Sequence, residues 1–144
     1  MHADPWKSYR QTATLTAPPG QIVLMLFDGT LRSLERALVG FSCSDPGQAN
    51  MTIHNNLSRA QQIIRELNHA LNMDQGGEFA ATLRRLYDYF DRRLAESNHR
   101  KQREGIDEVI RHVTELRNAW AAMLSKSDPS AMPMGHGLLA SSNA

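Results

Sequence analysis

The chain has 144 residues, of which 41% are hydrophobic and 22% are charged, a mixture typical of one globular domain with a hydrophobic core. Its 16 Lys and Arg nearly balance its 15 Asp and Glu, which argues against a nucleic-acid-binding protein. The single cysteine, Cys43, cannot form an internal disulfide, so nothing indicates an oxidising compartment.

The N-terminal region reads as an arm followed by a helix start. Residues 1–17 show no helical periodicity, carry the isolated aromatics Trp6 and Tyr9, and are expected to be mobile. Residues 1–10 are polar and lack the apolar stretch of a secretory signal. The longest apolar run, 22–27, is too short to span a bilayer. We therefore expect a cytoplasmic protein without membrane insertion.

Apolar residues recur at three- and four-residue spacings after this arm, which is the pattern of amphipathic helices. Turn-forming clusters rich in Ser, Asp, Pro and Gly separate the periodic segments. The predicted helices span residues 19–41, 48–73, 77–98 and 102–125. The predicted apolar stripe of the second helix is Ile53, Leu57, Ala60, Ile64, Leu67 and Leu71, and that of the third is Phe79, Leu83, Leu86, Phe90 and Leu94.

Four helices of similar length with short connections predict an all-α fold, an antiparallel up-down-up-down four-helix bundle. The bundle domain is expected over residues 18–126, between the arm 1–17 and a disordered tail 127–144.

The predicted helix 19–41 carries apolar residues around more than half of its circumference, whereas an ordinary surface helix has a narrower stripe. Ile22, Met25 and Leu26 belong to a second stripe beside the first. Such a helix is either covered by its own neighbours or offers a groove to another amphipathic helix. The sequence leaves both interpretations open.

The sequence lacks the recognisable motifs of catalytic and ligand-binding sites, which predicts a protein that is not an enzyme and that uses no cofactor. The six histidines include no pair four residues apart, and Glu66-x-x-His69 has no second copy to complete a di-iron site. There is no phosphate-binding loop, dinucleotide fingerprint or nucleophile elbow. We therefore predict no catalytic residue and no metal site.

Three stretches resemble the family of flagellin-specific export chaperones called FliS. The first is Thr16-Ala17-Pro18-Pro19 with the following segment 22–29 (IVLMLFDG), the second is 57–64 (LSRAQQII), and the third is 76–98, with Gly76-Gly77-Glu78-Phe79 and Leu86-Tyr87-Asp88-Tyr89-Phe90. Glu108-Val109 and Leu116-Arg117 with Ala119-Trp120 continue the match. Pro18 stands where the family has a helix-capping serine.

The resemblance implies a chaperone that holds the C-terminal segment of flagellin until it is handed to the flagellar type III export apparatus. It also implies that the arm with Tyr9 lies over the binding groove when flagellin is absent. The candidate flagellin-binding residues combine Tyr9 with the apolar stripes of the first three helices. They are Tyr9, Ile22, Met25, Leu26, Leu57, Gln61, Ile64, Leu86, Tyr89 and Arg93.

Three questions stay open at the level of sequence. Residues of these stripes can belong to the core or to a groove, and periodicity does not separate the two. The alternative function is a regulatory adaptor that binds another flagellar protein, an anti-sigma factor or a component of the export gate. Monomer and dimer are equally compatible with the sequence.

Overall fold

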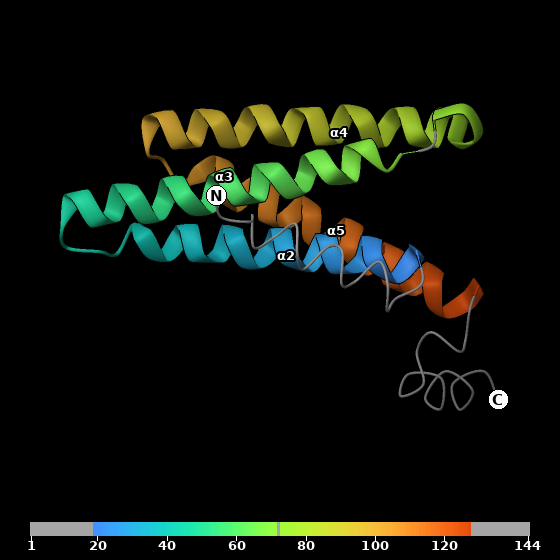
Figure 1. Ribbon diagram of the computed structural model, residues 1–144, viewed down its shortest axis with the longest axis horizontal. Coiled ribbons are helices and arrows are strands. Elements are labelled where there is room, and N and C mark those ends of the chain that lie inside the picture. Colours follow the sequence, from blue (N-terminus) through green and yellow to red (C-terminus); the bar gives the residue numbers. More distant parts are fainter. Residues whose placement is uncertain (1–18, 72, 128–144) are drawn as a thin grey trace, which may run out of the picture. The chain divides into compact units, whose positions relative to one another are not determined.

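The computed structural model describes residues 19–71 and 73–127, which form four α-helices and, within these ranges, no β-strand (Figure 1). The helices are α2 (Pro19–Gly40), α3 (Pro46–His69), α4 (Met73–Arg100) and α5 (Glu104–Ser127). The all-α prediction is confirmed. The predicted arm lies outside the described residues, and so does nearly all of the predicted tail.

The chain divides into two compact units, which are described separately. The larger unit runs from Leu26 to Leu116 and contains most of every helix. In the described part of the chain, the smaller unit consists of the first turns of α2 and the last turns of α5, residues 19–25 and 117–127.

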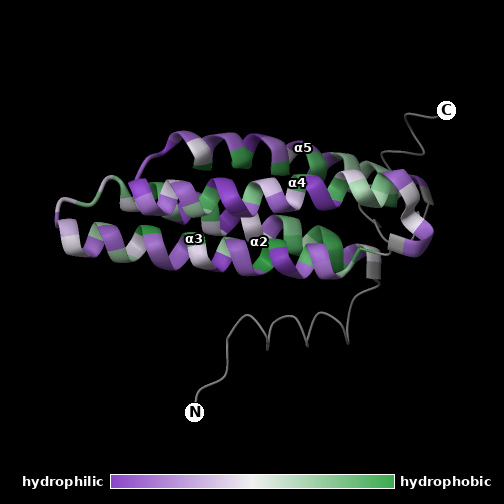
Figure 2. Ribbon diagram, turned by 90° about the horizontal axis from the view of Figure 1, so that it is seen from above, coloured by the Kyte–Doolittle hydropathy of each residue, from purple (hydrophilic) through white to green (hydrophobic). Residues whose placement is uncertain are grey.

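The larger unit is held together by the apolar faces of its four helices. Figure 2 shows hydrophobic and hydrophilic residues alternating around the helices, as amphipathic helices require. The stripe of α3 matches its sequence pattern, except that Leu71 lies beyond the end of the helix. The buried apolar side chains of the unit are Leu26, Phe27, Leu34, Ala37, Ile53, Leu57, Ala60, Ile63, Ile64, Leu67, Ala80, Leu83, Tyr87, Phe90, Leu94, Ile106, Val109 and Val113.

Polar side chains join α3 to α4 along the outside of this core. The His54 ring and the Asn98 amide lie 2.9 Å apart, and the Gln61 amide donates to the Asp91 carboxylate at 2.8 Å. Because residue numbers rise along α3 as those of their partners fall along α4, the two helices are antiparallel. This polar seam fixes their register.

Local signals in the sequence explain where the helices begin and end. The Asp45 carboxylate accepts the backbone N–H of Gln48 at 3.3 Å and Pro46 occupies the first turn, so α3 starts two residues earlier than predicted. Lys101 ends α4 in a left-handed conformation with φ 52°. Its ammonium group donates to the backbone carbonyl of Asn98 at 2.7 Å, which satisfies a carbonyl at the helix end.

The start of α4 differs most from prediction. The helix was expected from residue 77, but it begins at Met73 and is interrupted at Gly77, where φ is 55° and ψ is −134°. Side chains larger than hydrogen avoid this region of backbone conformation. Gly77 therefore redirects the chain between a first turn and the main body of α4.

In the smaller unit, the start of α2 contacts the end of α5. The Trp120 indole N–H donates to the backbone carbonyl of Gly20 at 2.9 Å. A Cβ added at Gly20 would overlap the Leu124 side chain. Among the described residues of this unit, a hydrogen bond and a close approach of the Leu124 side chain to Gly20 therefore join the start of α2 to the end of α5.

Replacing Gly77 by alanine tests the kink. We expect Gly77→Ala to lower the free energy of unfolding by about 1–3 kcal/mol, because alanine is strained at this backbone conformation. Chemical denaturation measures the change. Gly47→Ala is the matched control, since no atom lies within 4 Å of a Cβ added there and Gly47 is helical. Equal stability of the two variants would contradict the assignment of strain to Gly77.

Candidate functional site

Helix α4 has two apolar stripes, and only one of them is used by the core. The buried residues recur every three or four positions and are Ala80, Leu83, Tyr87, Phe90, Leu94 and Ser97. The sequence prediction placed Phe79 and Leu86 on this stripe, and that was wrong by one residue each. Phe79 is 63% exposed and Leu86 is only half buried.

The second stripe of α4 runs through Phe79, Leu86, Tyr89 and Arg93, which follow one another at spacings of seven, three and four residues. Such spacings place all four on one face of a helix. Tyr89 is exposed at 36%. We call these four residues the α4 stripe.

The polar end of the α4 stripe is fixed by Glu108 of α5. The Tyr89 hydroxyl donates to one Glu108 carboxylate oxygen at 2.6 Å, and Arg93 Nε donates to the other at 2.8 Å. Arg93 also donates to Glu96 at 2.8 Å. One carboxylate thus aligns an aromatic ring and a guanidinium group at the boundary between two helices.

These contacts shift the acidities of their members. The hydrogen bond from Arg93, and then that from Tyr89, lowers the pKa of Glu108 below its usual value. The bond to Glu108 raises the pKa of the Tyr89 phenol, because it stabilises the protonated hydroxyl. Glu108 and Glu96 raise the pKa of Arg93 further. The network is therefore a charged, intact ion pair near neutral pH.

Aromatic contacts link the network to the core. The His112 ring of α5 stacks on buried Phe90, with centroids 6.0 Å apart and an interplanar angle of 18°. Tyr89 meets the same Phe90 ring edge-on at 6.3 Å. By contrast, burial alone raises the pKa of Tyr87 to about 12, so the two tyrosines of this region differ in role. Tyr87 belongs to the core and Tyr89 to the surface.

Three of the candidate flagellin-binding residues are core residues. Leu26, Leu57 and Ile64 are each 5% exposed or less, so they offer no surface to a partner in this structure. Both stripes of α2 contribute to the interior here, since Leu26 and Phe27 are both buried. For this part of α2, the interpretation of a helix covered by its own neighbours applies.

Gln61 connects two helices and also lines a shallow pocket at the surface of the larger unit. Its amide donates to the side chain of Asp91 at 2.8 Å and to the Asp91 backbone carbonyl at 3.2 Å. Arg65 pairs with the same carboxylate at 3.1 Å. Gln61 therefore positions α3 against α4.

The remaining candidates fall elsewhere. Ile22 and Met25 are half buried in the smaller unit, while Tyr9 lies outside the described residues. Within the larger unit the structure thus brings together Leu86, Tyr89 and Arg93.

Phe79 and Glu108 complete this surface and were not among the candidate residues. Periodicity does not separate Phe79 from Ala80, because two adjacent apolar residues of a helix can both be buried, as Leu26 and Phe27 are. Nothing in the sequence pairs Glu108 with Tyr89 and Arg93, because that pairing depends on the register between α4 and α5.

Sequence comparisons place the chain among known proteins. The model of the family "Flagellar protein FliS" matches residues 2–127. The flagellar secretion chaperone FliS of Bacillus subtilis is 36% identical over 117 residues, covering 81% of this chain and 84% of that protein. The chain belongs to the FliS family. The Salmonella typhimurium chaperone of the same name is 35% identical over 129 residues, covering 84% of this chain and 90% of that one.

Membership makes this chain a relative of flagellar secretion chaperones, a class of protein that acts by binding other proteins. A third relative, the FliS of Vibrio cholerae, is 32% identical over 105 residues. The FliS resemblance of the motifs is thereby confirmed. Two of those segments, 76–98 and Glu108-Val109, supply the residues that meet around Glu108.

The described residues form neither a metal-binding cluster nor a membrane-spanning helix. No three His, Cys, Asp or Glu side chains in 19–71 and 73–127 lie close enough together to hold a metal ion. No described helix combines the length and apolar character needed to cross a bilayer.

The lowered pKa of Glu108 predicts a pH-dependent contribution to stability. A carboxyl whose pKa is lower in the folded state stabilises the fold above its unfolded-state pKa, and this contribution disappears as pH falls through the folded-state value. At pH 7 we expect Glu108→Gln to lower the free energy of unfolding by about 1 kcal/mol.

The difference between wild type and Glu108→Gln should shrink as the pH falls from 5 to 3. Urea denaturation at several pH values measures it, and Glu115→Gln, at a more exposed α5 carboxylate, is the control. A difference that stays constant down to pH 3 would contradict the role given to the Glu108 ion pair.

Proposed function

We propose that this protein binds the C-terminal segment of flagellin in the cytoplasm, keeps it from polymerising prematurely, and delivers it to the flagellar type III export apparatus. Membership of a family of flagellar secretion chaperones supports a protein client. The observation that carries the proposal is the α4 stripe, apolar surface that the bundle itself does not bury.

The α4 stripe suits an amphipathic helix as its occupant. Phe79 and Leu86 provide two apolar anchors one heptad apart, the spacing at which a helix laid alongside presents its own apolar residues. A filament subunit's terminal segment that is helical only in contact with other subunits exposes such residues when free. Covering them removes the apolar surface that drives premature assembly.

The polar end of the α4 stripe gives the occupant a direction. Tyr89 offers an aromatic face beside the fixed Arg93 guanidinium, and tyrosine and arginine are the residues that most often dominate binding energy at interfaces. Because Glu108 holds both side chains in place, less side-chain entropy is lost when a partner binds. An apolar end and a polar end together favour one orientation of the bound helix.

Tyr9 remains part of the proposal. The arm that carries it would compete with flagellin for the same surface in the free chaperone, and such competition lowers the apparent affinity by the fraction of sites it occupies.

Calorimetric titration with a synthetic peptide from the C-terminus of flagellin tests the proposal. We expect one-to-one binding and a gain in helical circular dichroism on mixing. Phe79→Asp should weaken binding at least tenfold, since burying a phenylalanine contributes about 1.5–3 kcal/mol. Met51→Asp, which alters an equally exposed side chain of α3, is the matched control and should bind as wild type does.

Two results would overturn the proposal. One is a peptide that gives neither heat nor helix gain with the wild-type protein. The other is a Phe79→Asp variant that folds normally and keeps wild-type affinity, which would place the binding surface away from α4.

A further inference from the structure

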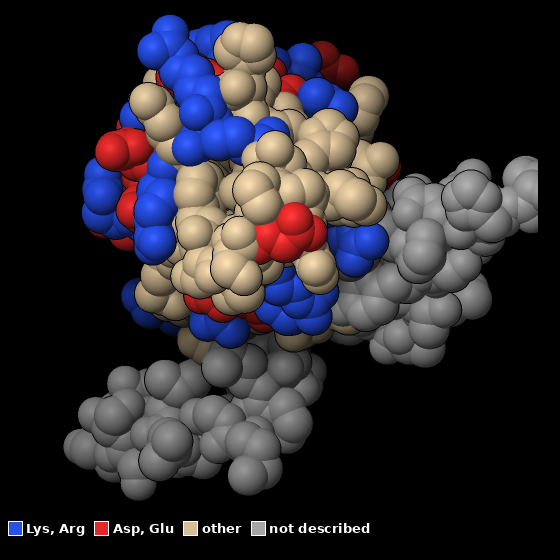
Figure 3. Space-filling view, turned by 90° about the vertical axis from the view of Figure 1, so that its left-hand side faces the viewer, with Lys and Arg blue, Asp and Glu red and all other residues tan. Residues whose placement is uncertain are grey.

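A surface with few charged side chains covers the α2–α3 turn and the first half of α3, and the exposed Arg103 guanidinium borders it, lying over the Phe41 ring at 5.9 Å. In the 18 residues 41–58, Asp45 is the single Asp, Glu, Lys or Arg, whereas 22% of the whole chain is charged, a share that would put about four charges in such a stretch. The Asp45 carboxylate is engaged in capping α3. Figure 3 views this end and shows a broad area without charged side chains between basic and acidic groups.

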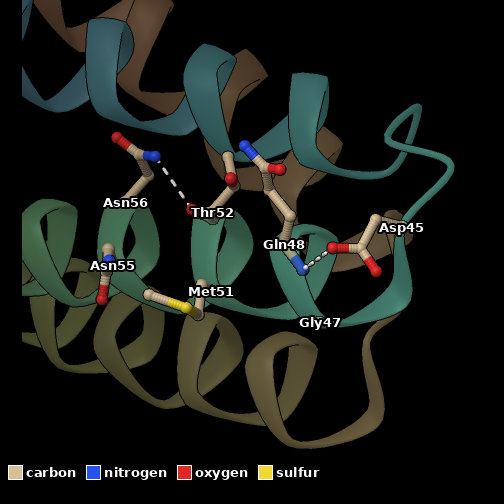
Figure 4. A pocket seen from close by; sticks show the side chains of 7 residues that line it. All are labelled: Asp45, Gly47, Gln48, Met51, Thr52, Asn55 and Asn56. Atoms are coloured by element: carbon tan, nitrogen blue, oxygen red, sulfur yellow. Dashed lines mark hydrogen bonds between the residues drawn. The ribbon is translucent and has the colours of Figure 1, made fainter.

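This surface has both a protruding side chain and a hollow. Met51 is 65% exposed, the largest exposed fraction given for a large hydrophobic residue of the described chain. Figure 4 shows the residues that line the hollow beside it. Gln48, Thr52 and Asn56 rise on one side of α3, Met51 and Asn55 lie on another, and Asp45 stands at the start of the helix as the one charged residue of the lining. An exposed methionine with few charged neighbours is typical of protein interfaces, because interfaces are enriched in methionine and depleted of charged residues relative to the rest of the surface.

The polar groups around Met51 can pair with copies of themselves. Asparagine and glutamine amides each carry a donor and an acceptor. Among the described residues, neither the Gln48 nor the Asn55 side chain has a hydrogen-bond partner, while Asn56 donates to the backbone carbonyl of Thr52 at 2.8 Å. The amides of Gln48 and Asn55 can therefore form hydrogen bonds with a partner that binds beside the exposed Met51.

The charge pattern points to a second copy of this chain as the occupant. Across a two-fold axis each surface meets itself, so any charged group near the axis faces a like charge. A partner of a different sequence would not require an uncharged surface, because opposite charges could be paired across the interface. The lack of charge over 41–58, with amides and one methionine in its place, is the pattern that self-association favours.

We propose that the chain self-associates through the first half of α3, with Met51 packing into the hollow of the other copy and amides pairing around it. None of the residues of this surface belongs to the α4 stripe, so the inference is independent of the proposed flagellin binding. Thirteen helical residues span only about 20 Å, a small contact. The dimer is therefore weak and forms only at high protein concentration.

Sedimentation equilibrium over a wide range of concentrations tests this. The average mass of the wild type should rise from 16.1 kDa toward twice that value as concentration increases. Met51→Asp and the nearly isosteric Asn55→Asp each place like charges opposite one another, and should weaken association at least tenfold. Phe79→Asp carries the same charge change at another exposed apolar residue and should associate as wild type does.

Two outcomes would overturn the inference. A wild type that stays at 16.1 kDa at every concentration would leave this surface to a different protein. A Met51→Asp variant that associates as strongly as wild type would place the dimer contact elsewhere. Because Met51→Asp is also the control in the flagellin titration, failure of one proposal is distinguishable from failure of the other.

Discussion

Helix α4 must pack against two neighbours at once, and most of the molecule's surface chemistry depends on how it does so. Its stripe of buried residues, which includes Phe90, faces the core. On one side of α4, the Asp91 carboxylate accepts a hydrogen bond from Gln61 and pairs with Arg65, both of α3. On another side, Arg93 pairs with Glu108 of α5. With the rotation of α4 fixed by these polar contacts, Phe79 and Leu86 are left outside the core.

The fixed rotation of α4 connects the fold to the proposed function, because it determines which apolar side chains stay exposed. Exposed apolar surface is unfavourable for a chaperone in isolation, yet it is the surface that a client helix can bury. Charged hydrogen bonds at Glu108 keep the surface in one shape without covering it. We propose that a second surface, which has few charges and lies at the other end of the larger unit, associates with a copy of itself, so that one bundle carries two contacts of different chemistry.

The sequence was sufficient for the helices and for most of the core, because three- and four-residue spacing reports directly which face is buried. It located the α3 stripe almost residue for residue. It was one residue off on α4, since Phe79 and Leu86 continue the periodicity as well as Ala80 and Tyr87 do. The Glu108 contacts could not be predicted, because they depend on how α4 and α5 are aligned. The FliS resemblance, in turn, came from motifs and not from periodicity.

Photo-cross-linking from α4 tests the central claim most directly. A photoreactive amino acid at Thr82, exposed on α4 between Phe79 and Leu86, should cross-link to the C-terminal segment of co-expressed flagellin. The same group at Asn55 of α3 should not. Flagellin captured from position 55 and not from position 82 would contradict the account, because the client would then lie on α3 and the apolar α4 stripe would need another explanation.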